Sequence, residues 1–296
     1  METEQRQNEK FDISEQNCAN TIYTVDSFAN GISFGSQQVD PNLDPRSEFS
    51  LPIYDERDVI RLRRRYALKE KNPLSQLELQ LMNLSRKGIL GRSHIIFGTT
   101  TDPFFPFDSK FDASMKFLNI FEKYTPGHLT IQTRSPLLVI AIPVLAKLGK
   151  RISVTIGIET NDEDSVRKYT PNFPRAEERL KAARALRRFG IEVTLQVSPV
   201  LPYGDWREDA SEFAEALVGA SDYIYIEPFI SSKEERSYLV NGSLLGKALA
   251  QNKKYHWLRH DSAQPLYDAV EMLAPEKLER PVRSHNQEKQ MSFFAA

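Results

Sequence analysis

Residues 95–106, with the sequence IIFGTTTDPFFP, are the stretch on which the expected fold depends. The three apolar residues at its start have the length and composition of a buried strand. Gly98 follows, where a missing side chain lets backbone or ligand come close. Three threonines and Asp102 then lead into a loop that two prolines stiffen. A parallel α/β protein builds a site in this way, although an ordinary Asp-Pro turn would have the same residues.

Apolar strands and helices alternate along the chain around this stretch. Further strands are expected at 21–25, 31–35, 129–132, 152–158, 193–197 and 223–226, and helices at 55–66, 75–87, 113–123, 136–148, 175–189 and 206–218. Near-continuous apolar strands separated by helices predict parallel strands covered by helices. Repeated right-handed crossovers predict a full or partial TIM-like (β/α) barrel. An open doubly wound sheet is the alternative, but no G-x-G-x-x-G follows any strand, which disfavours a dinucleotide fold.

Composition limits the partners and the compartment. The chain has 296 residues, 40% of them apolar, and a net charge of −1, which argues against strong diffuse attraction to nucleic acid or membrane. No apolar run approaches the ~20 residues of a membrane span. Cys18 is the single cysteine, so no intrachain disulfide can form. We expect a cytoplasmic protein with a disordered segment at 1–20, a barrel with terminal additions at 21–273, and a flexible tail at 274–296.

Polar side chains follow each expected strand at the end where a barrel places its site. They are Thr100, Thr101, Asp102, Thr133, Arg134, Ser135, Glu159, Ser198 and Glu227. Strands usually meet polar loops, but charges such as Arg134 and Glu159 in a barrel mouth favour function. We therefore expect an anionic or zwitterionic ligand there, with Arg134 pairing its carboxylate or phosphate.

Several motifs in order resemble those of one enzyme family. They are G-T-T-T-D-P-F-F-P at 98–106, Q-T-R-S at 132–135, N-F-P-R at 172–175, R-L at 179–180, L-R-R-F-G at 186–190 and V-S-P-V-L-P at 197–202. Together they resemble the spore photoproduct lyase family of radical S-adenosylmethionine enzymes, over about 93–229. The resemblance implies a partial (β/α)6 barrel with an N-terminal helical segment and C-terminal helices, S-adenosylmethionine in its mouth, and DNA as substrate.

The chain departs from this family at the iron–sulfur motif. The family holds a 4Fe-4S cluster with C-x-x-x-C-x-Y-C, and three thiolates are needed because cluster iron prefers sulfur. If Cys18 began such a motif, Ile22 and Val25 would occupy the other thiolate positions, and neither can bind iron. His256 and His260 have the i, i+4 spacing of a zinc pair on a helix, but no third ligand is evident, and a solvated polar helix explains them as well. We therefore expect a barrel without the cluster.

Two groups of arginines are candidates for DNA contact. Arg61, Arg64 and Arg65 share one face of an expected helix, and Arg184, Arg187 and Arg188 lie near the end of another. A solvated face balanced by Glu177 and Glu178 is the alternative for the second group. With a net charge of −1, either group could hold a phosphate or two without driving tight binding alone.

The C-terminal tail ends in an apolar peptide. Residues 290–294 resemble the bacterial sliding-clamp-binding pentapeptide Q-L-[S/D]-L-F, through Gln290, Met291, Ser292, Phe293 and Phe294. Folding back onto the barrel is the alternative for these apolar side chains. A tether to a clamp would convert weak DNA contact into an intramolecular event.

The resulting hypothesis is a DNA-repair-associated protein recruited through the replication clamp, with its enzymatic status open. The alternatives are an active radical S-adenosylmethionine DNA lyase, a cluster-free enzyme that binds S-adenosylmethionine, and a plain scaffold with no DNA role.

Overall fold

The computed structural model describes residues 21–28, 31–38, 72–104, 107–231 and 239–278. Its strands form one seven-stranded sheet with the order β2-β1-β3-β4-β5-β6-β7. The strands are β1 (Thr21–Phe28), β2 (Gly31–Gln38), β3 (His94–Phe97), β4 (His128–Thr133), β5 (Ile152–Gly157), β6 (Glu192–Val197) and β7 (Tyr223–Ile226). Each strand predicted from the sequence is therefore confirmed.

Six of these strands are parallel, and each new one is added beside the previous one. Only β2, which pairs with β1, runs antiparallel. An order without reversal is that of a barrel wall, whereas a doubly wound sheet reverses its order at a switch point. The partial (β/α) barrel is therefore confirmed as the fold class, with a sheet that is curved but not closed.

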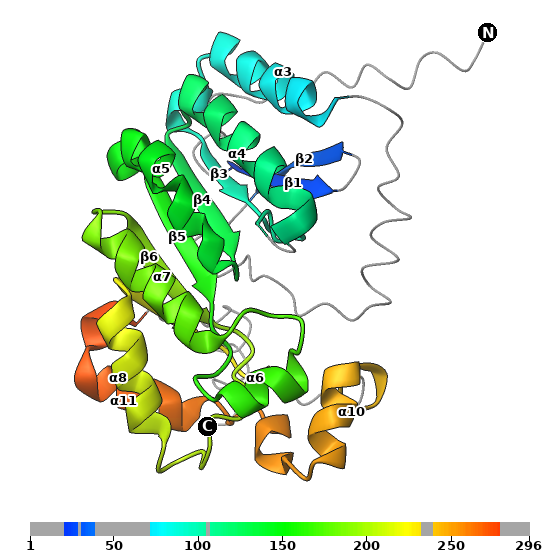
Figure 1. Cartoon of the computed structure of the whole chain (residues 1–296), viewed down its shortest axis with the longest axis vertical. Coiled ribbons are helices and arrows are strands. Elements are labelled where there is room, and N and C mark those ends of the chain that lie inside the picture. Colours follow the sequence, from blue (N-terminus) through cyan, green and yellow to red (C-terminus); the bar gives the residue numbers. More distant parts are fainter. Residues whose placement is uncertain (1–20, 29–30, 39–71, 105–106, 232–238, 279–296) are drawn as a thin grey trace, which may run out of the picture.

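Helices lie between the strands and after them, five of those in the described ranges at or near predicted helices and three, at 163–169, 244–251 and 264–273, without a predicted counterpart. They are α3 (Pro73–Arg86), α4 (Phe107–Lys123), α5 (Ile142–Leu148), α6 (Glu163–Tyr169), α7 (Ala176–Arg188), α8 (Ala210–Ala220), α10 (Leu244–Gln251) and α11 (Gln264–Leu273). Figure 1 shows α4, α5 and α7 lying in front of the strands. None of the helices in the described ranges is both long enough and apolar enough to span a membrane.

Some expected helices differ from the structure. The helix expected at 136–148 begins as a 3-10 turn, η3 (Pro136–Ala141), and becomes α-helical only from Ile142. The i, i+4 helical pair of His256 and His260 is wrong, because η5 (Tyr255–Leu258) is a 3-10 turn and Arg259 after it is extended. The helix expected at 55–66, with Arg61, Arg64 and Arg65, lies outside the described residues.

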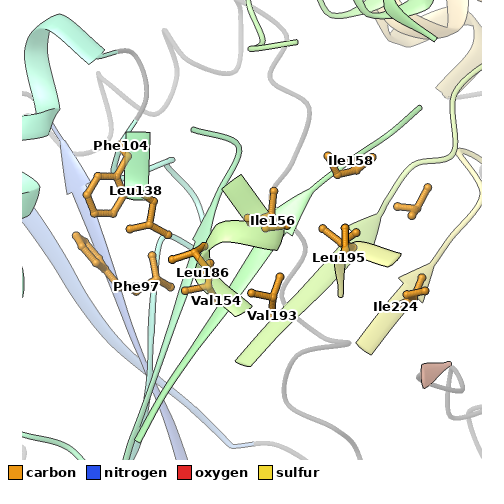
Figure 2. Packing of buried hydrophobic residues seen from close by; sticks show 14 of the residues in the cluster. Phe97, Phe104, Leu138, Val154, Ile156, Ile158, Leu186, Val193, Leu195 and Ile224 are labelled. Carbon is orange, nitrogen blue, oxygen red and sulfur yellow. The ribbon is translucent and has the colours of Figure 1, made fainter. Parts of the chain in front are cut away.

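The two faces of the sheet differ in chemistry. Side chains that point toward the helices are apolar, and Figure 2 shows Val154, Ile156, Val193, Leu195 and Ile224 side by side on neighbouring strands. Since side chains alternate along a strand, the opposite face carries the intervening residues. These are largely polar and buried, and include Thr130, Gln132, Ser153, Thr155, Thr194 and Gln196. The sheet therefore has an apolar outer face and a polar inner face.

Gly98 follows β3 in a conformation that few other residues adopt. Its φ is 102°, and a Cβ there would come within 2.6 Å of the Gln132 carbonyl oxygen and 2.7 Å of Pro103 Cδ. The backbone of the neighbouring strand and the loop proline therefore occupy the space that a side chain would need. This close approach positions the loop that follows β3.

Candidate active site at the barrel mouth

A carboxylate at the end of β1 holds the loop that follows β3. Asp26 Oδ1 accepts hydrogen bonds from the backbone of Thr100 at 2.6 Å and Thr101 at 3.1 Å, and its Oδ2 accepts one from Thr99 Oγ1 at 2.7 Å. Asp26 is only 5% exposed. The threonines expected to face a ligand are thus fixed through their backbone by a neighbouring strand.

Asp102 does the same for the loop that follows β4. Its carboxylate accepts from Thr133 Oγ1 at 2.7 Å, from the Arg134 backbone N–H at 2.7 Å and from the Phe104 backbone N–H at 2.9 Å. Ser135 then caps η3, because its hydroxyl accepts from the Leu137 N–H. The two loops are therefore joined by one buried side chain.

Two buried arginines share one glutamate at the end of β5. Glu159 Oε1 lies 2.5 Å from Arg134 Nε, and Glu159 Oε2 lies 2.7 Å from Arg179 Nη1. The Arg134 guanidinium also lies 4.7 Å from the centre of the Phe173 ring. Gly157 makes room for it, because a Cβ there would come within 3.0 Å of Arg134 Cγ and Nε. Arg134 consequently crosses the inner face of β5 at the barrel mouth.

The last two strands complete the mouth with a similar link. Ser198 Oγ, after β6, donates to Glu227 Oε2, after β7, at 2.9 Å. The loop after β6 also joins the mouth through its backbone, since the Leu201 N–H donates to the Glu159 carbonyl at 2.8 Å. Carboxylates from β1, β3, β5 and β7 thus connect successive strand ends.

The pKa values of the two most buried carboxylates move in opposite directions. Burial raises the pKa of Asp102, and its three hydrogen bonds together with Arg134 only partly offset this. Burial also opposes the charge of Glu159, but the combined attraction of Arg134 and Arg179 outweighs it and lowers the pKa of Glu159 to about 2. Glu159 is therefore ionised at neutral pH, while Asp102 gains a proton more readily than an exposed aspartate.

Buried polar atoms without partners among the described residues lie next to this network. Arg179 is 0% exposed, yet its Nε and Nη2 form no hydrogen bond within the described ranges, and Gln196 Nε2 and Thr155 Oγ1 are in the same state. Gln196 pairs with Gly157 across β5 and β6, so it lies beside the strand that Arg134 crosses. A buried polar group without a hydrogen-bond partner lowers the stability of the fold. We call the inner-face region around Arg179, Gln196 and Thr155 the floor of the mouth; a ligand bound there could supply the missing hydrogen-bond partners.

The structure brings together most of the residues that the sequence singled out. Asp102, Thr133, Arg134, Ser135 and Glu159 form one connected network. Thr100 and Thr101 donate their backbone N–H groups to Asp26, and Ser198 belongs to the separate link with Glu227. Asp26, Arg179 and Gln196 also belong to the site, and the sequence reasoning gave them no role there. The sequence signal for Asp26 is its place directly after the apolar run 21–25, whose last residue, Val25, pairs with β3.

The candidate DNA-binding arginines of α7 lie at the other end of the barrel. Arg187 pairs with Asp222, which precedes β7, at 2.8 Å, and Arg188 ends the helix. Arg184 lies one turn before Arg188 on the same helix. The peptide at 290–294 and Cys18 lie outside the described residues. Within the described ranges, no cluster of three or more His, Cys, Asp or Glu side chains could hold a metal ion.

Comparison with known proteins yields distant structural likenesses. Neither the protein-family models nor the curated proteins give a match. Among solved structures, a cysteine-to-serine mutant of spore photoproduct lyase has a TM-score of 0.47 and 13% identity, covering 69% of this chain and 65% of that chain. A mutant of the same enzyme with bound AdoMet and dinucleoside spore photoproduct gives the same values. Xanthomonas albilineans dihydropteroate synthase has a TM-score of 0.24 and 13% identity, covering 71% of this chain and 87% of that chain. The chain thus spans just under two thirds of the length of the lyase.

Proposed function

We propose that the barrel mouth binds a small zwitterion of the S-adenosylmethionine class, and that the protein acts in DNA repair without an iron–sulfur cluster. The observation that carries the ligand proposal is the pairing of Arg134 and Arg179 with a single glutamate. A ligand carboxylate that took Arg134 would leave Glu159 paired with Arg179. Binding would therefore strand no buried charge, which is the usual penalty for opening a buried ion pair.

The buried polar atoms of the floor also suit such a ligand. Gln196 Nε2 and Thr155 Oγ1 have no hydrogen-bond partner among the described residues. The oxygens and nitrogens of a ligand's ribose and base could be the hydrogen-bond partners of these two atoms. In this proposal Arg134 contacts the ligand carboxylate, whereas Asp102 and Glu159 are positioning residues. The carboxylate oxygens of Asp102 accept hydrogen bonds from Thr133, Arg134 and Phe104. Asp102 therefore fixes the conformation of the loop and does not contact the ligand.

The residues of this chain do not fit a 4Fe-4S cluster. Such a cluster needs three thiolates, and the full sequence has one cysteine. We therefore assign no reaction step to a cluster. Anaerobic reconstitution with iron and sulfide, followed by iron analysis and visible absorbance, tests this assignment. Stoichiometric iron and sulfide with reductive cleavage of S-adenosylmethionine would instead favour an active radical lyase.

Calorimetry with S-adenosylmethionine and the full chain tests the mouth. We expect measurable heat that is lost in Arg134→Ala, because the ligand carboxylate loses a charge-assisted partner. Arg184→Ala, which removes the same charge at the opposite end, is the matched control and should bind as the parent does. An Arg134→Ala variant that keeps the affinity of the parent, or a parent without heat, would show that the site assignment is wrong.

Recruitment by a sliding clamp rests on the C-terminal peptide alone. Burying one phenylalanine side chain contributes about 1.5–3 kcal/mol, so Phe293 and Phe294 together are of the order needed for micromolar binding. We expect alanine at both positions to abolish clamp binding in a pull-down or by surface plasmon resonance, with an unchanged melting temperature. If the peptide folds back onto the barrel, the same double variant lowers the melting temperature and the parent shows no clamp affinity.

A further inference from the structure

An aromatic and basic surface lies on the loop after β6 and the segment after α10. The segment 252–261 contains Lys253, Lys254, Tyr255, His256, Trp257, Arg259 and His260, and the loop contributes Trp206 and Arg207. We call these residues the rim surface. The site and the candidate DNA-binding arginines described above include none of them.

Aromatic stacking organises this surface. The His256 ring stacks on Trp206, with centroids 5.1 Å apart and an interplanar angle of 15°, and the Arg207 guanidinium lies 4.6 Å from the Trp206 centroid. Below them, Trp257 is 2% exposed and packs edge-on against Tyr203 at 4.8 Å. Tyr255 remains 58% exposed. The buried pair of Trp257 and Tyr203 thus anchors the segment that carries the exposed rings of Tyr255 and His256.

Basic side chains flank these rings. Arg259 is held by both oxygens of Asp261, at 2.8 and 2.6 Å. By contrast, the described part of the chain shows no ion pair for Lys253, Lys254 or Arg207. Lys253 has a φ of 56°, a region that favours glycine, so the chain accepts backbone strain at the turn that carries the two lysines. The nearby Asp205 carboxylate accepts from the backbone of Arg207 and Glu208.

The rim surface lies at the mouth end of the barrel. Its loop begins at the C-terminal end of β6, and the backbone N–H of Leu201 in that loop donates to Glu159 of the mouth. Thr160 Oγ1, after β5, also donates to Pro202 of the loop at 2.7 Å. Figure 1 shows α6 and α10 beyond the arrowheads of β4 and β5. A polymer on this surface would therefore pass beside the mouth, whereas one held by Arg187 and Arg188 would not.

We propose that the rim surface binds single-stranded nucleic acid, with bases stacked on Tyr255 and His256 and phosphates paired with Lys253, Lys254 and Arg207. Exposed rings beside available cations are the features by which proteins hold single strands without reading sequence. A duplex keeps its bases stacked internally, so it would meet only the cations. This inference deepens the proposed function, since it places the nucleic acid at the mouth end.

The two tryptophans of the chain allow a direct test. Both Trp206 and Trp257 belong to this surface or its anchor, so intrinsic tryptophan fluorescence reports on it alone. Titrating the full chain with a thymidine oligonucleotide of about twelve nucleotides should quench this fluorescence. In the double variant Tyr255→Ala and His256→Ala, we expect affinity by anisotropy with a labelled oligonucleotide to fall by at least about thirtyfold.

Four controls separate stacking from charge and from the mouth ligand. Lys150→Ala with Arg151→Ala removes two exposed cations that precede β5, at the far end of the barrel, and should leave affinity unchanged. Lys253→Ala with Lys254→Ala should weaken binding and flatten its salt dependence. The same oligonucleotide as a duplex should bind without quenching. Heat from S-adenosylmethionine should be unchanged in the Tyr255 and His256 variant, so that failure of the mouth proposal and failure of this one are distinguishable. Equal affinity of parent and double variant, or equal quenching by the duplex, overturns the inference.

Discussion

The two ends of the inner barrel face solve the burial of polar groups in different ways. At the mouth, Glu159 pairs with the two arginines Arg134 and Arg179, and Asp102 accepts hydrogen bonds from backbone and hydroxyl donors. At the opposite end, hydroxyls and imidazoles form a chain, in which His94 Nε2 lies 2.8 Å from Thr130 Oγ1, Thr130 Oγ1 lies 2.9 Å from Ser153 Oγ, and Ser153 Oγ lies 2.8 Å from His128 Nε2.

This difference is informative because burying hydrogen-bonded hydroxyls costs less free energy than burying ion pairs. Buried ion pairs seldom stabilise a fold more than apolar residues of the same volume, whereas breaking one is costly. Buried charges concentrated at one end of the barrel therefore indicate a functional role there, such as ligand binding, beyond stabilising the fold. If folding stability were the only requirement, both ends could be filled by hydroxyl and imidazole hydrogen bonds, as at the end that carries His94 and His128.

The largest loss of stability is expected for substitution of Glu159, whose single charge pairs with two arginines. Glu159→Gln removes the buried carboxylate that Arg134 and Arg179 share, so we expect the free energy of unfolding to fall by about 3–5 kcal/mol. Urea denaturation measures this. Glu78→Gln is the matched control, since Glu78 pairs with an exposed Lys123 and should cost less than about 1 kcal/mol. Equal losses in the two variants would show that the mouth pairs are not structurally special.

The pH dependence of stability follows from the same pair of carboxylates. The pKa of Glu159 is lowered to about 2 in the folded state. The ionised Glu159 therefore stabilises the folded state above its unfolded pKa, and this contribution is lost as the pH falls from the unfolded pKa through the folded pKa. The size of this contribution is on the order of 3 kcal/mol. The raised pKa of Asp102 acts in reverse: its contribution is present at low pH and is lost as pH rises through its folded pKa.

Unfolding free energies measured between neutral and acidic pH separate these two contributions. We expect Glu159→Gln to flatten the acid limb and Asp102→Asn to steepen it, because the second variant loses the group that gains stability on protonation. A steeper acid limb in Glu159→Gln would contradict the assigned pairing.

The sequence was sufficient for the strands and for the edge of the sheet where the site lies. Apolar runs such as 152–158 and the alternation with helices determine both, and polar residues after each run identify the mouth. The partners of those residues were not accessible in this way. Glu159 meets Arg179, which is on a helix two elements further along, and only the packing of α7 against the sheet brings them together.

The position of the α7 arginines follows from the direction of their helix. A crossover helix runs antiparallel to its strands, so its C-terminal end lies at the N-terminal ends of the strands. Arg187 and Arg188 end α7, and the sequence alone therefore places them far from the mouth. Asp26 was missed for another reason: β1 is a weak strand in sequence, and its role depends on its pairing with β3.

A smaller effect is expected at the end that carries His94 and His128. Ser153→Ala removes the hydroxyl that joins Thr130 to His128, so one buried hydroxyl and one imidazole each lose a partner. We expect a loss of about 1–3 kcal/mol in urea denaturation, less than for Glu159→Gln. Thr130→Val is a shape-matched comparison that should cost a similar amount. A loss at Ser153 above that at Glu159 would reverse the proposed contrast between the ends.

The smallest effect is expected for Arg187, the candidate DNA contact at the far end. Its pair with Asp222 is about one-third exposed on each side, which limits the gain to about 1 kcal/mol or less. Arg187→Ala should also relieve Lys277, whose pKa is lowered by burial and by repulsion from Arg187, and whose ammonium donates to the Val218 and Ser221 carbonyls. Asp222→Ala should cost more, because Asp222 also accepts from the Val193 backbone at 2.9 Å. Urea midpoints of both variants, with an NMR titration of Lys277 in Arg187→Ala, test this order. A larger loss at Arg187 than at Asp222, or an unchanged pKa of Lys277, would show that the far end depends on its charges as the mouth does.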